Sequence, residues 1–384
     1  MYRSNPGQPP AVLFAVTEDW YFWSHRKPLA DYLRRQGCDV SIATRFNEHE
    51  MSLGQAGFHC IALPFERSLR YPLRDLRAMF GLWSVVRRVR PNIVHLVSLK
   101  PILLSCLALT VHRRTHFVAA FTGLGYVFSS RDRRARWFQR CVVALLRIVL
   151  RRPNVWIIVQ NTDDRALLEA AGLGDPERTV LIAGAGVDVE AFAFAAVTTT
   201  DPPLVILPAR LIWDKGIEEF VAAARIVKQA SPATRMALVG ADDPDNPAAI
   251  PPLLIDAWVK EGVIEWWGHR YDMQTVYHEA SIVCLPSYRE GLPKVLLEAA
   301  ACGRPLIASD VAGCREICRE AVNGILVPPR APEALAAAIE YLLASPETQR
   351  TYGTAGRDIV EREYSIEHIG QQTLACYQRL LDGA

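Results

Sequence analysis

The sequence predicts an α/β protein with two domains, each built on a parallel sheet with helices on both faces. Three observations support this fold class. The chain has 384 residues, more than one compact core usually holds. Half of the residues are hydrophobic, which is enough for two large cores. Short apolar, β-branched runs alternate with helical patterns along nearly the whole chain, as they do in repeated β-α-β units.

The predicted elements follow one another in that alternating order. The strands expected in the first half are 11–16, 39–44, 59–62, 92–97, 116–121, 155–160 and 179–182. Those expected in the second half are 204–209, 235–239, 263–267, 281–285, 305–309 and 325–327. Helical patterns lie at 25–36, 73–89, 133–151, 217–229, 294–302 and 332–343. A helix between two successive strands lets them lie parallel in one sheet, so each half is expected to be Rossmann-like.

The two halves are separated by a stretch that is small, Thr-rich and ends in a Pro-Pro pair, which predicts a linker. The expected organisation is a disordered leader (1–10), an N-terminal Rossmann-like domain (11–185), the linker (186–203), a C-terminal Rossmann-like domain (204–364) and a last helix (365–384) packing back on the N-terminal domain. Ligands of such sheets bind beyond the carboxyl ends of the strands, here in a cleft where the two domains are expected to face each other.

The charge is distributed unevenly. The net charge is +2, yet residues 1–185 hold 26 Lys and Arg against 14 Asp and Glu. Segments 67–90 and 131–152 combine many arginines with aromatic residues such as Trp83 and Trp137. Two interpretations stay open: helices that dock on an anionic membrane, or core-facing helices with a solvated basic face. No nucleic-acid partner is expected, because no basic–aromatic recognition module is present.

Cysteines and apolar runs indicate a cytoplasmic protein. None of the nine cysteines forms a C-x-x-C pair, and Cys314 and Cys318 have no nearby His to complete a zinc site, so reduced thiols are expected. The first apolar run, 11–16, is too short for a signal peptide. The longest apolar stretch, 93–111, contains a His, a Lys and a Pro, which favours a strand, a loop and a helix over a membrane span.

The most informative stretch is "PSYREGLPKVLLEAAACG" at 286–303. A predicted strand ends here, a loop follows, and a helix begins with Pro293 expected at its first position. The backbone N–H groups of Leu292, Lys294 and Val295, reached through Gly291, would then face a ligand. A helix start approached through a glycine is suited to an anion such as a diphosphate.

Two glutamates flank this anion site. Carboxylates repel phosphate, but they accept hydrogen bonds from vicinal hydroxyls of a sugar. Glu298 is therefore predicted to hold a ribose and Glu290 a hexose, with the diphosphate between them. The alternative for Glu298, an ordinary helical surface residue, is disfavoured by its apolar flanks.

Two cations follow another predicted strand, in "LVILPARLIWDKGIEEF" at 204–220. Arg210 and Lys215 are expected to neutralise the diphosphate and to stabilise it as a leaving group. The alternative is a pair of ordinary solvated charges.

These motifs resemble a known family. The segments "ARLIWDKG" (209–216), "EGLPKVLLEAAACGRPLIASDVAGCREI" (290–317) and "NGILVPPRAPEALAAAI" (323–339) resemble the Glu-x7-Glu retaining glycosyltransferases of family 4, which have the GT-B fold. In the first half, "HLVSLKP", "FTGLGYVF" and "VQNTDD" are similar to its capsular-polysaccharide and lipid-linked-oligosaccharide branch. The likeness covers nearly the whole chain.

The resemblance implies roles for single residues. Glu298 would hold the ribose of a nucleotide-sugar, Arg210 and Lys215 the diphosphate, and Glu290 the donor sugar. The loop 268–270, with His269 and Arg270, would receive the base, largely through backbone atoms. The implied reaction retains anomeric configuration by front-face attack and requires no metal cofactor.

The acceptor side departs from the family pattern. Many relatives carry a histidine directly after the strand at 116–121, where this chain has Thr122 and Gly123. His25 is the nearest acceptor-side candidate, and a structural histidine at a helix N-terminus is the alternative for it. The turn at 183–188 is expected to be part of the hinge.

Two weaker motif matches do not predict binding sites. The sequence "DPD" at 243–245 matches a metal-binding Asp-x-Asp, but its many turn residues favour a turn. The pairs Gly123-x-Gly125 and Gly184-x-Gly186 do not complete a dinucleotide-binding fingerprint, so NAD is not expected.

The leading hypothesis is a retaining glycosyltransferase, cytoplasmic and peripheral on the inner face of the plasma membrane of a bacterium. It would move a hexose or N-acetylhexosamine from a UDP-sugar to a lipid-pyrophosphate-linked glycan, for cell-surface polysaccharide or oligosaccharide biosynthesis. Two alternatives stay open: a UDP-N-acetylhexosamine 2-epimerase-like enzyme, and a non-catalytic sugar-nucleotide-binding membrane scaffold.

Overall fold

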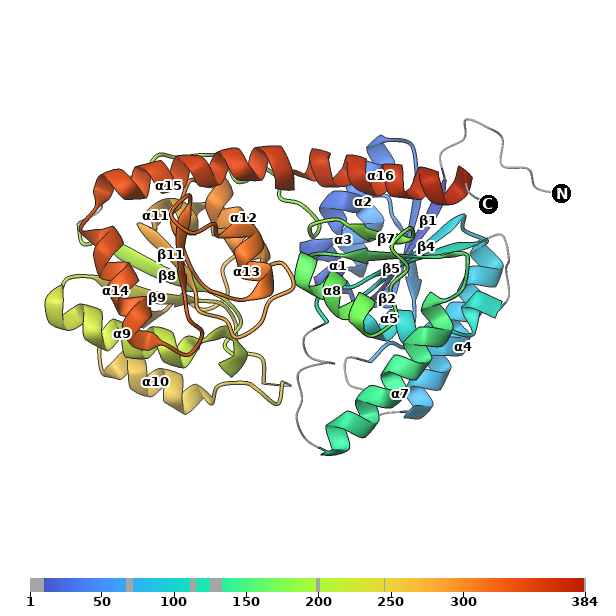
Figure 1. Cartoon of the computed structure of the whole chain (residues 1–384), viewed down its shortest axis with the longest axis horizontal. Coiled ribbons are helices and arrows are strands. Elements are labelled where there is room, and N and C mark those ends of the chain that lie inside the picture. The colour runs from blue at the N-terminus through green and yellow to red at the C-terminus, as the bar shows by residue number, and fades with distance from the viewer. Residues whose placement is uncertain are drawn as a thin grey trace. The chain divides into compact units, whose positions relative to one another are not determined.

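The computed structural model describes most of the chain as two compact α/β units (Figure 1). The described residues are 10–66, 72–110, 115–124, 133–197, 201–244 and 246–382, without the side chains of 110 and 133–138. One unit contains Met1–Gly186 and Ile366–Ala384, and the other contains Val187–Ser365. Most of the predicted leader and parts of both basic segments lie outside the described residues. Each unit has one parallel sheet flanked by helices, which confirms the predicted fold class.

The N-terminal unit has a seven-stranded parallel sheet in the order β3-β2-β1-β4-β5-β6-β7. The strands are β1 (Ala11–Glu18), β2 (Asp39–Arg45), β3 (His59–Ala62), β4 (Ile93–Val97), β5 (His116–Ala120), β6 (Val155–Val159) and β7 (Thr179–Leu181). The helices are α1 (Asp19–His25), α2 (Lys27–Arg35), α3 (Glu50–Gln55), α4 (Pro72–Val89), α5 (Leu99–Leu104), α7 (Arg133–Leu150), α8 (Thr162–Ala170) and α16 (Ile366–Asp382), with a short 3-10 turn η1 (Ala108–Thr110).

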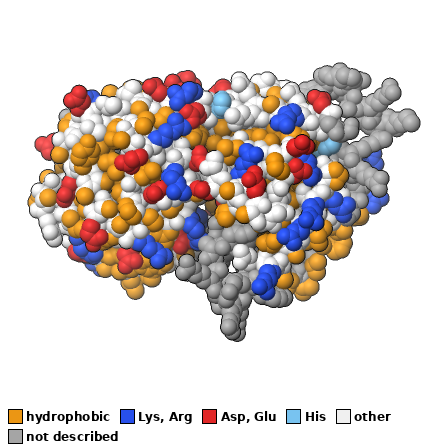
Figure 2. Space-filling view, in the orientation of Figure 1, with side chains coloured by type: hydrophobic (Ala, Val, Ile, Leu, Met, Phe, Trp, Pro, Cys, Tyr) orange, Lys and Arg blue, Asp and Glu red, His pale blue; other side chains and the backbone are white. Residues whose placement is uncertain are grey.

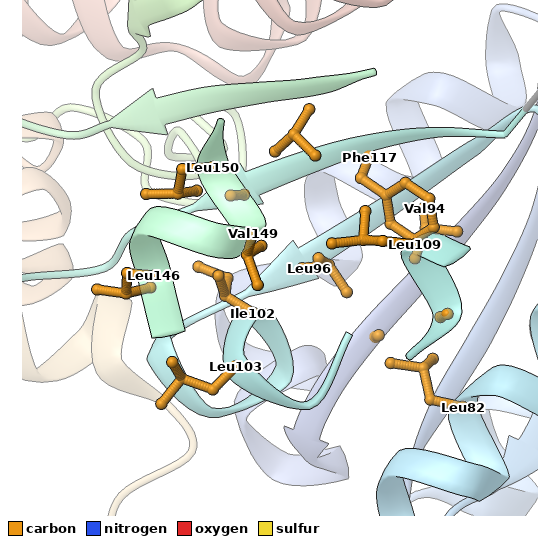
Figure 3. Packing of buried hydrophobic residues seen from close by; sticks show 14 of the residues in the cluster. Leu82, Val94, Leu96, Ile102, Leu103, Leu109, Phe117, Leu146, Val149 and Leu150 are labelled. Carbon is orange, nitrogen blue, oxygen red and sulfur yellow. The ribbon is translucent and has the colours of Figure 1, made fainter. Parts of the chain in front are cut away.

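The sheet separates two cores, because successive side chains of a strand point to opposite faces. In β1, Leu13 lies in the core with α4, α5 and α7, whereas Phe14 lies in the core with α2 and α16. Figure 3 shows the first core, where Leu82 of α4 and Leu146 of α7 lie around the strands. Burial on both faces explains why the strands are nearly continuous apolar runs.

One helical prediction was wrong at its start. The pattern predicts one helix over 25–36, but the structure has α1 from Asp19, an interruption at Arg26, and then α2. Pro28 has no N–H to donate to the preceding turn, so the helix cannot run straight through. Asp19 is fully buried and accepts backbone N–H bonds from Trp20 and from residues 47–49, which fixes the start of α1.

Helix α16 packs on the N-terminal unit through a buried polar contact. The Nδ1 atom of His95, on β4, lies 2.6 Å from the hydroxyl of Tyr377, and the His95 ring stacks on Phe14. Gly370 lies so close to Tyr32 that an added Cβ would come within 2.3 Å of its ring. Burial, and then the positive charge of Arg26, lower the pKa of His95 well below its ordinary value of 6.5.

The buried His95 leads to a pH-dependent prediction. The folded protein keeps this imidazole neutral at a pH where the unfolded chain binds a proton. Stability is therefore expected to be full above pH 6.5 and to fall as the pH drops below it, by at most about 1.4 kcal/mol per pH unit for one proton. Urea unfolding at several pH values measures this dependence. Below pH 6.5, the slope of the free energy of unfolding against pH should be smaller for His95→Gln than for His59→Gln, a control at an exposed position. Equal slopes would contradict this assignment.

The C-terminal unit has a six-stranded parallel sheet in the order β10-β9-β8-β11-β12-β13. The strands are β8 (Leu204–Pro208), β9 (Arg235–Val239), β10 (Glu265–Trp266), β11 (Ile282–Leu285), β12 (Leu306–Ser309) and β13 (Gly324–Val327). The helices are α9 (Ile217–Ala230), α10 (Pro252–Lys260), α11 (Met273–Glu279), α12 (Lys294–Ala301), α13 (Ala312–Ile317), α14 (Pro332–Leu343) and α15 (Pro346–Ile359), with a 3-10 turn η2 (Trp213–Lys215) and a π turn η3 (Val360–Tyr364).

Two features of this unit differ from the simple pattern. The strand expected at 263–267 has ladder pairing only at Glu265 and Trp266, because β10 is an edge strand and Gly268 turns the chain with a φ of 65°. The first part of the predicted linker is held on this unit. Arg357 donates to the carbonyls of Val189 and Phe192 at 3.0 and 2.9 Å.

Among the described residues, no helix combines the length and the apolar character that crossing a bilayer requires.

Candidate functional site

The candidate site lies at the centre of the C-terminal sheet, where the strand order reverses between β8 and β11. In parallel sheets, the carboxyl ends beside such a reversal are the usual place for a ligand. The two loops that leave these strands are in contact: the N–H of Tyr288 donates to the carbonyl of Asp214 at 2.9 Å. A Cβ added to Gly216 would lie 2.1 Å from the carbonyl oxygen of Pro286. The fold thus brings together the two sequence motifs that were predicted to act on one ligand.

Lys215 and Glu290, both predicted to be catalytic, form an ion pair across these loops. The Nζ atom of Lys215 lies 2.5 Å from Oε1 of Glu290. The Lys215 side chain is 21% exposed and that of Glu290 10%, so both are largely enclosed but reachable. Lys215 ends η2, and Gly216 then adopts a left-handed conformation (φ 71°) that leads the chain into α9. The pair fixes a cation and a carboxylate side by side at the sheet edge.

Arg210 lies in the same loop and is held by a different carboxylate. Its Nη1 atom lies 2.6 Å from Oδ2 of Asp243, and 41% of the Arg210 side chain is exposed. A guanidinium has five N–H donors, so this pairing leaves others for a ligand. The N–H of Asn246 donates to the carbonyl of Asp243, as in the turn expected there; Asp245 lies outside the described residues. Within the described part of the chain, no three His, Cys, Asp or Glu side chains gather as they would for a metal ion.

Glu298 is buried in α12 and has two polar partners. Its Oε2 accepts a hydrogen bond from the hydroxyl of Tyr277 at 3.0 Å, and its Oε1 pairs with the ammonium of Lys294. Burial, and then the charge of Glu298, raise the pKa of Tyr277 well above its ordinary value. The Lys294 ammonium also lies 5.8 Å from the centre of the Phe192 ring. Glu298 is therefore no solvated surface residue, and each oxygen keeps a lone pair for a further donor.

The start of α12 is positioned by its surroundings. Pro293 directly precedes the helix as its cap residue, one position earlier than expected, and is buried. Gly291, Leu292, Lys294 and Val295 are partly exposed. The first N–H groups of any helix have no partner within the helix, so this end can bind an anion.

The backbone before α12 is held by α13. A Cβ on Gly313 would lie 2.4 Å from the carbonyl oxygen of Gly291 and 2.7 Å from that of Glu290. Only a glycine allows this approach, so α13 restrains the loop that carries Glu290.

Tyr288 connects the same loop to α9. Its hydroxyl donates to Oε1 of the buried Glu219 at 2.6 Å, and the guanidinium of Arg330 lies 4.6 Å from the centre of its ring. Burial, and then the hydrogen bond to Glu219, raise the pKa of Tyr288. Tyr288 thereby supports the loop between Pro286 and Glu290.

We expect Tyr288→Phe to destabilise the C-terminal unit by about 1–3 kcal/mol, because a buried carboxylate would lose its hydrogen-bond donor. The other oxygen of Glu219 has no hydrogen-bond partner in the described structure, which adds to the loss. Urea unfolding measures the change, and Tyr341→Phe, at an exposed position of α14, is the matched control. Equal stabilities of the two variants would contradict the role of this hydrogen bond.

His269 and Arg270 follow β10 on the same sheet edge, two strands away from β8 and so roughly 10 Å along it. Arg270 pairs with Asp272 at 2.5 Å, which lowers the pKa of that carboxyl to about 2. His269 packs edge-to-face on Tyr271. The structure places this pair at the sheet edge without bringing it to the Lys215–Glu290 pair.

Three predicted acceptor-side residues lie in the N-terminal unit. Thr122 and Gly123 follow β5, and the next N–H, that of Leu124, donates to the buried Asp164 at 3.2 Å. His25 is the last residue of α1, not the start of a helix as its structural alternative assumed. Its ring stacks on Tyr21 with centroids 4.3 Å apart, and its Nδ1 lies 2.6 Å from the Ser24 hydroxyl.

Sequence reasoning missed the partners of the predicted residues. Tyr277 lies 21 residues before Glu298, and Asp243 lies 33 residues after Arg210. No spacing rule connects such positions, because tertiary packing alone brings them together.

Family models match both halves of the chain. Residues 202–345 match the model described as glycosyl transferases group 1, and residues 11–161 match the one described as glycosyl transferase 4-like.

Curated relatives align over nearly the full length. The chain is 23% identical to the N,N'-diacetylbacillosaminyl-diphospho-undecaprenol alpha-1,3-N-acetylgalactosaminyltransferase of Campylobacter jejuni, over 93% of this chain and 95% of that protein. It is 26% identical to the putative glycosyltransferase EpsD of Bacillus subtilis, over 97% of each.

Solved structures share the fold. The sucrose-phosphate synthase of Thermosynechococcus elongatus superposes with a TM-score of 0.81 at 22% identity, over 98% of this chain and 100% of that one. HepE of Anabaena, solved with UDP and glucose, superposes with a TM-score of 0.74 at 17% identity, over 95% of this chain and 98% of that one.

Proposed function

Because this chain is a glycosyltransferase with the GT-B fold, we propose that it transfers a hexose or N-acetylhexosamine from a UDP-sugar to a lipid-pyrophosphate-linked glycan, with retention of configuration. One observation carries the proposal: Lys215 pairs with Glu290 across the segments that follow β8 and β11, where the strand order reverses, and Arg210 and the start of α12 belong to the same two segments.

The arrangement suits the departure of a nucleoside diphosphate. As the bond between the anomeric carbon and the phosphate oxygen breaks, negative charge grows on the diphosphate. In this proposal, Lys215, Arg210 and the N–H groups at the start of α12 stabilise that charge. The acceptor hydroxyl attacks from the same face and passes its proton to the departing phosphate, so no protein nucleophile is required. These donors would also stabilise the charge for which other enzymes use a metal ion.

The two glutamates have separate tasks in this proposal. Glu298 is held by Tyr277 and Lys294 and accepts hydrogen bonds from the ribose hydroxyls. Glu290 is oriented by Lys215 and contacts the hydroxyls of the donor sugar. The loop with His269 and Arg270 is assigned to the base, and the N-terminal unit, with Thr122, Gly123 and His25, to the acceptor.

The relatives support the choice of donor and acceptor. The Campylobacter relative is named for transfer onto an undecaprenol-diphosphate-linked sugar, and the HepE structures contain UDP, glucose or UDP-glucose. A lipid-linked acceptor resides in a membrane, so we place the enzyme at the cytoplasmic surface of a bacterial plasma membrane, in cell-envelope polysaccharide biosynthesis.

A direct assay tests the proposal. Purified protein is incubated with a panel of UDP- and GDP-sugars and polyprenyl-pyrophosphate-linked glycans, and nucleotide release is measured with and without acceptor. Release of UDP that requires the acceptor supports the transferase. Acceptor-independent conversion of UDP-N-acetylhexosamine would support the epimerase alternative, and nucleotide binding without turnover would support a scaffold.

A further inference from the structure

Helix α4 leaves an apolar stripe uncovered. Leu73, Leu76 and Phe80 are 75%, 48% and 56% exposed. Their spacings of three and four residues place them on one helical face. The opposite face of α4, with Ala78 and Leu82, lies in the core, so the helix is anchored and the stripe faces outward.

Cations surround this stripe. Arg77, Arg87 and Arg88 of α4 are exposed, and the Arg87 guanidinium lies 5.5 Å from the centre of the Trp83 ring. The only acidic residue of α4 is Asp75, and its carboxylate is largely buried against the ammonium of Lys100 at 2.6 Å. The outward face of α4 is therefore apolar and positively charged, with no exposed carboxylate.

Helix α7 extends the basic surface. Both α4 and α7 pack on α5. The described side chains of α7 expose Arg140, Arg147 and the apolar Ile148, and no acidic residue occurs in this helix. Figure 2 shows hydrophobic and Lys or Arg side chains lying together over the part of the N-terminal unit where Figure 1 draws α4 and α7.

We propose that α4 docks the chain on an anionic lipid bilayer, with Leu73, Leu76 and Phe80 entering the headgroup boundary and the arginines of α4 and α7 contacting lipid phosphates. Amphipathic helices with this combination of faces bind anionic membrane surfaces. The carboxylates of Glu66 and Asp75 are largely enclosed and paired with Arg74 and Lys100, so the exposed charge of this face is positive. That charge favours a lipid surface over a second copy of this chain, whose matching face would carry the same charge. The inference rests on the proposed function only in that a lipid-linked acceptor lies in a bilayer.

Vesicle co-sedimentation of the full chain tests this surface. The wild type should bind vesicles of phosphatidylcholine mixed with phosphatidylglycerol, and bind phosphatidylcholine alone far more weakly. The triple variant Leu73→Ser, Leu76→Ser, Phe80→Ser should lower partitioning by at least about 30-fold, and Arg77→Gln with Arg88→Gln by about 25-fold. Leu253→Ser, at an 83% exposed position of the other unit, is the matched control and should bind like the wild type. Circular dichroism and thermal unfolding check that each variant folds.

Three outcomes would overturn the inference. One is equal binding of the triple variant and the wild type; another is equal binding of the wild type to neutral and anionic vesicles. The third is a wild type that binds no vesicles but forms a dimer in sedimentation equilibrium, where among the variants only the triple variant is a monomer. The assay uses no nucleotide-sugar, so a wild type that binds anionic vesicles but transfers no sugar would refute the proposed function alone.

Discussion

Lys215→Met is expected to lower kcat/KM for sugar transfer by about 100- to 1000-fold, the effect of removing one fixed donor from a developing anion. The ammonium lies beside Glu290 at the sheet edge, where the departing diphosphate would gain its charge. The variant should also bind UDP more weakly. Initial rates at several donor concentrations and UDP titrations measure both effects.

The control for this prediction is Lys260→Met, at an exposed position of α10 in the same unit. It removes the same charge from the unit without touching the candidate site. A Lys215 variant that keeps kcat/KM within about threefold of the wild type would remove Lys215 from the proposed chemistry.

Glu298→Gln is expected to weaken UDP binding by about 100-fold. Hydrogen bonds to a charged group contribute about 1.5–3 kcal/mol each. The amide keeps one oxygen that accepts, so the ribose would lose one such bond and the charge assistance of the other, about 3 kcal/mol in total. The substitution also removes the charge that pairs with Lys294. A change in the local structure would therefore contribute to the loss of UDP affinity.

A ribose analogue separates these two effects. The wild type should bind UDP much more tightly than 2',3'-dideoxy-UDP, whereas the Glu298→Gln variant should discriminate little between them. If the variant keeps the full preference for UDP, Glu298 does not contact the ribose. Glu333→Gln, exposed in the first turn of α14, serves as the control and should behave like the wild type.

The regular elements could be predicted from the sequence because buried strands and helix faces appear as apolar patterns of neighbouring residues. Strands such as β4 and β8 are buried along their whole length, so their apolar runs mark them within one or two residues. The expected length of the edge strand β10 is too great, because the flanking Val263 and Ile264 are buried in the core without pairing in the sheet. Helix α1 was missed because Asp19 fixes it through residues 47–49, which are distant in sequence.

The candidate site could be predicted only in part, because some of its contacts join residues that are distant in sequence. The positions after β8 and β11 follow from the rule about carboxyl ends, and the structure joins Lys215 to Glu290 there. The partners Tyr277 and Asp243 depend on tertiary packing that no spacing encodes. The attachment of residues 187–197 to the C-terminal unit could not be predicted from the sequence either. It depends on hydrogen bonds from the distant Arg304 and Arg357 to backbone carbonyls.

A crystal structure of the chain with a bound UDP-sugar would show directly which residues hold the diphosphate. We expect the diphosphate to contact the Lys215 ammonium, the Arg210 guanidinium and the N–H groups at the start of α12, with the ribose hydroxyls on Glu298. A diphosphate bound at another edge of the C-terminal sheet, or in the N-terminal unit, would contradict it.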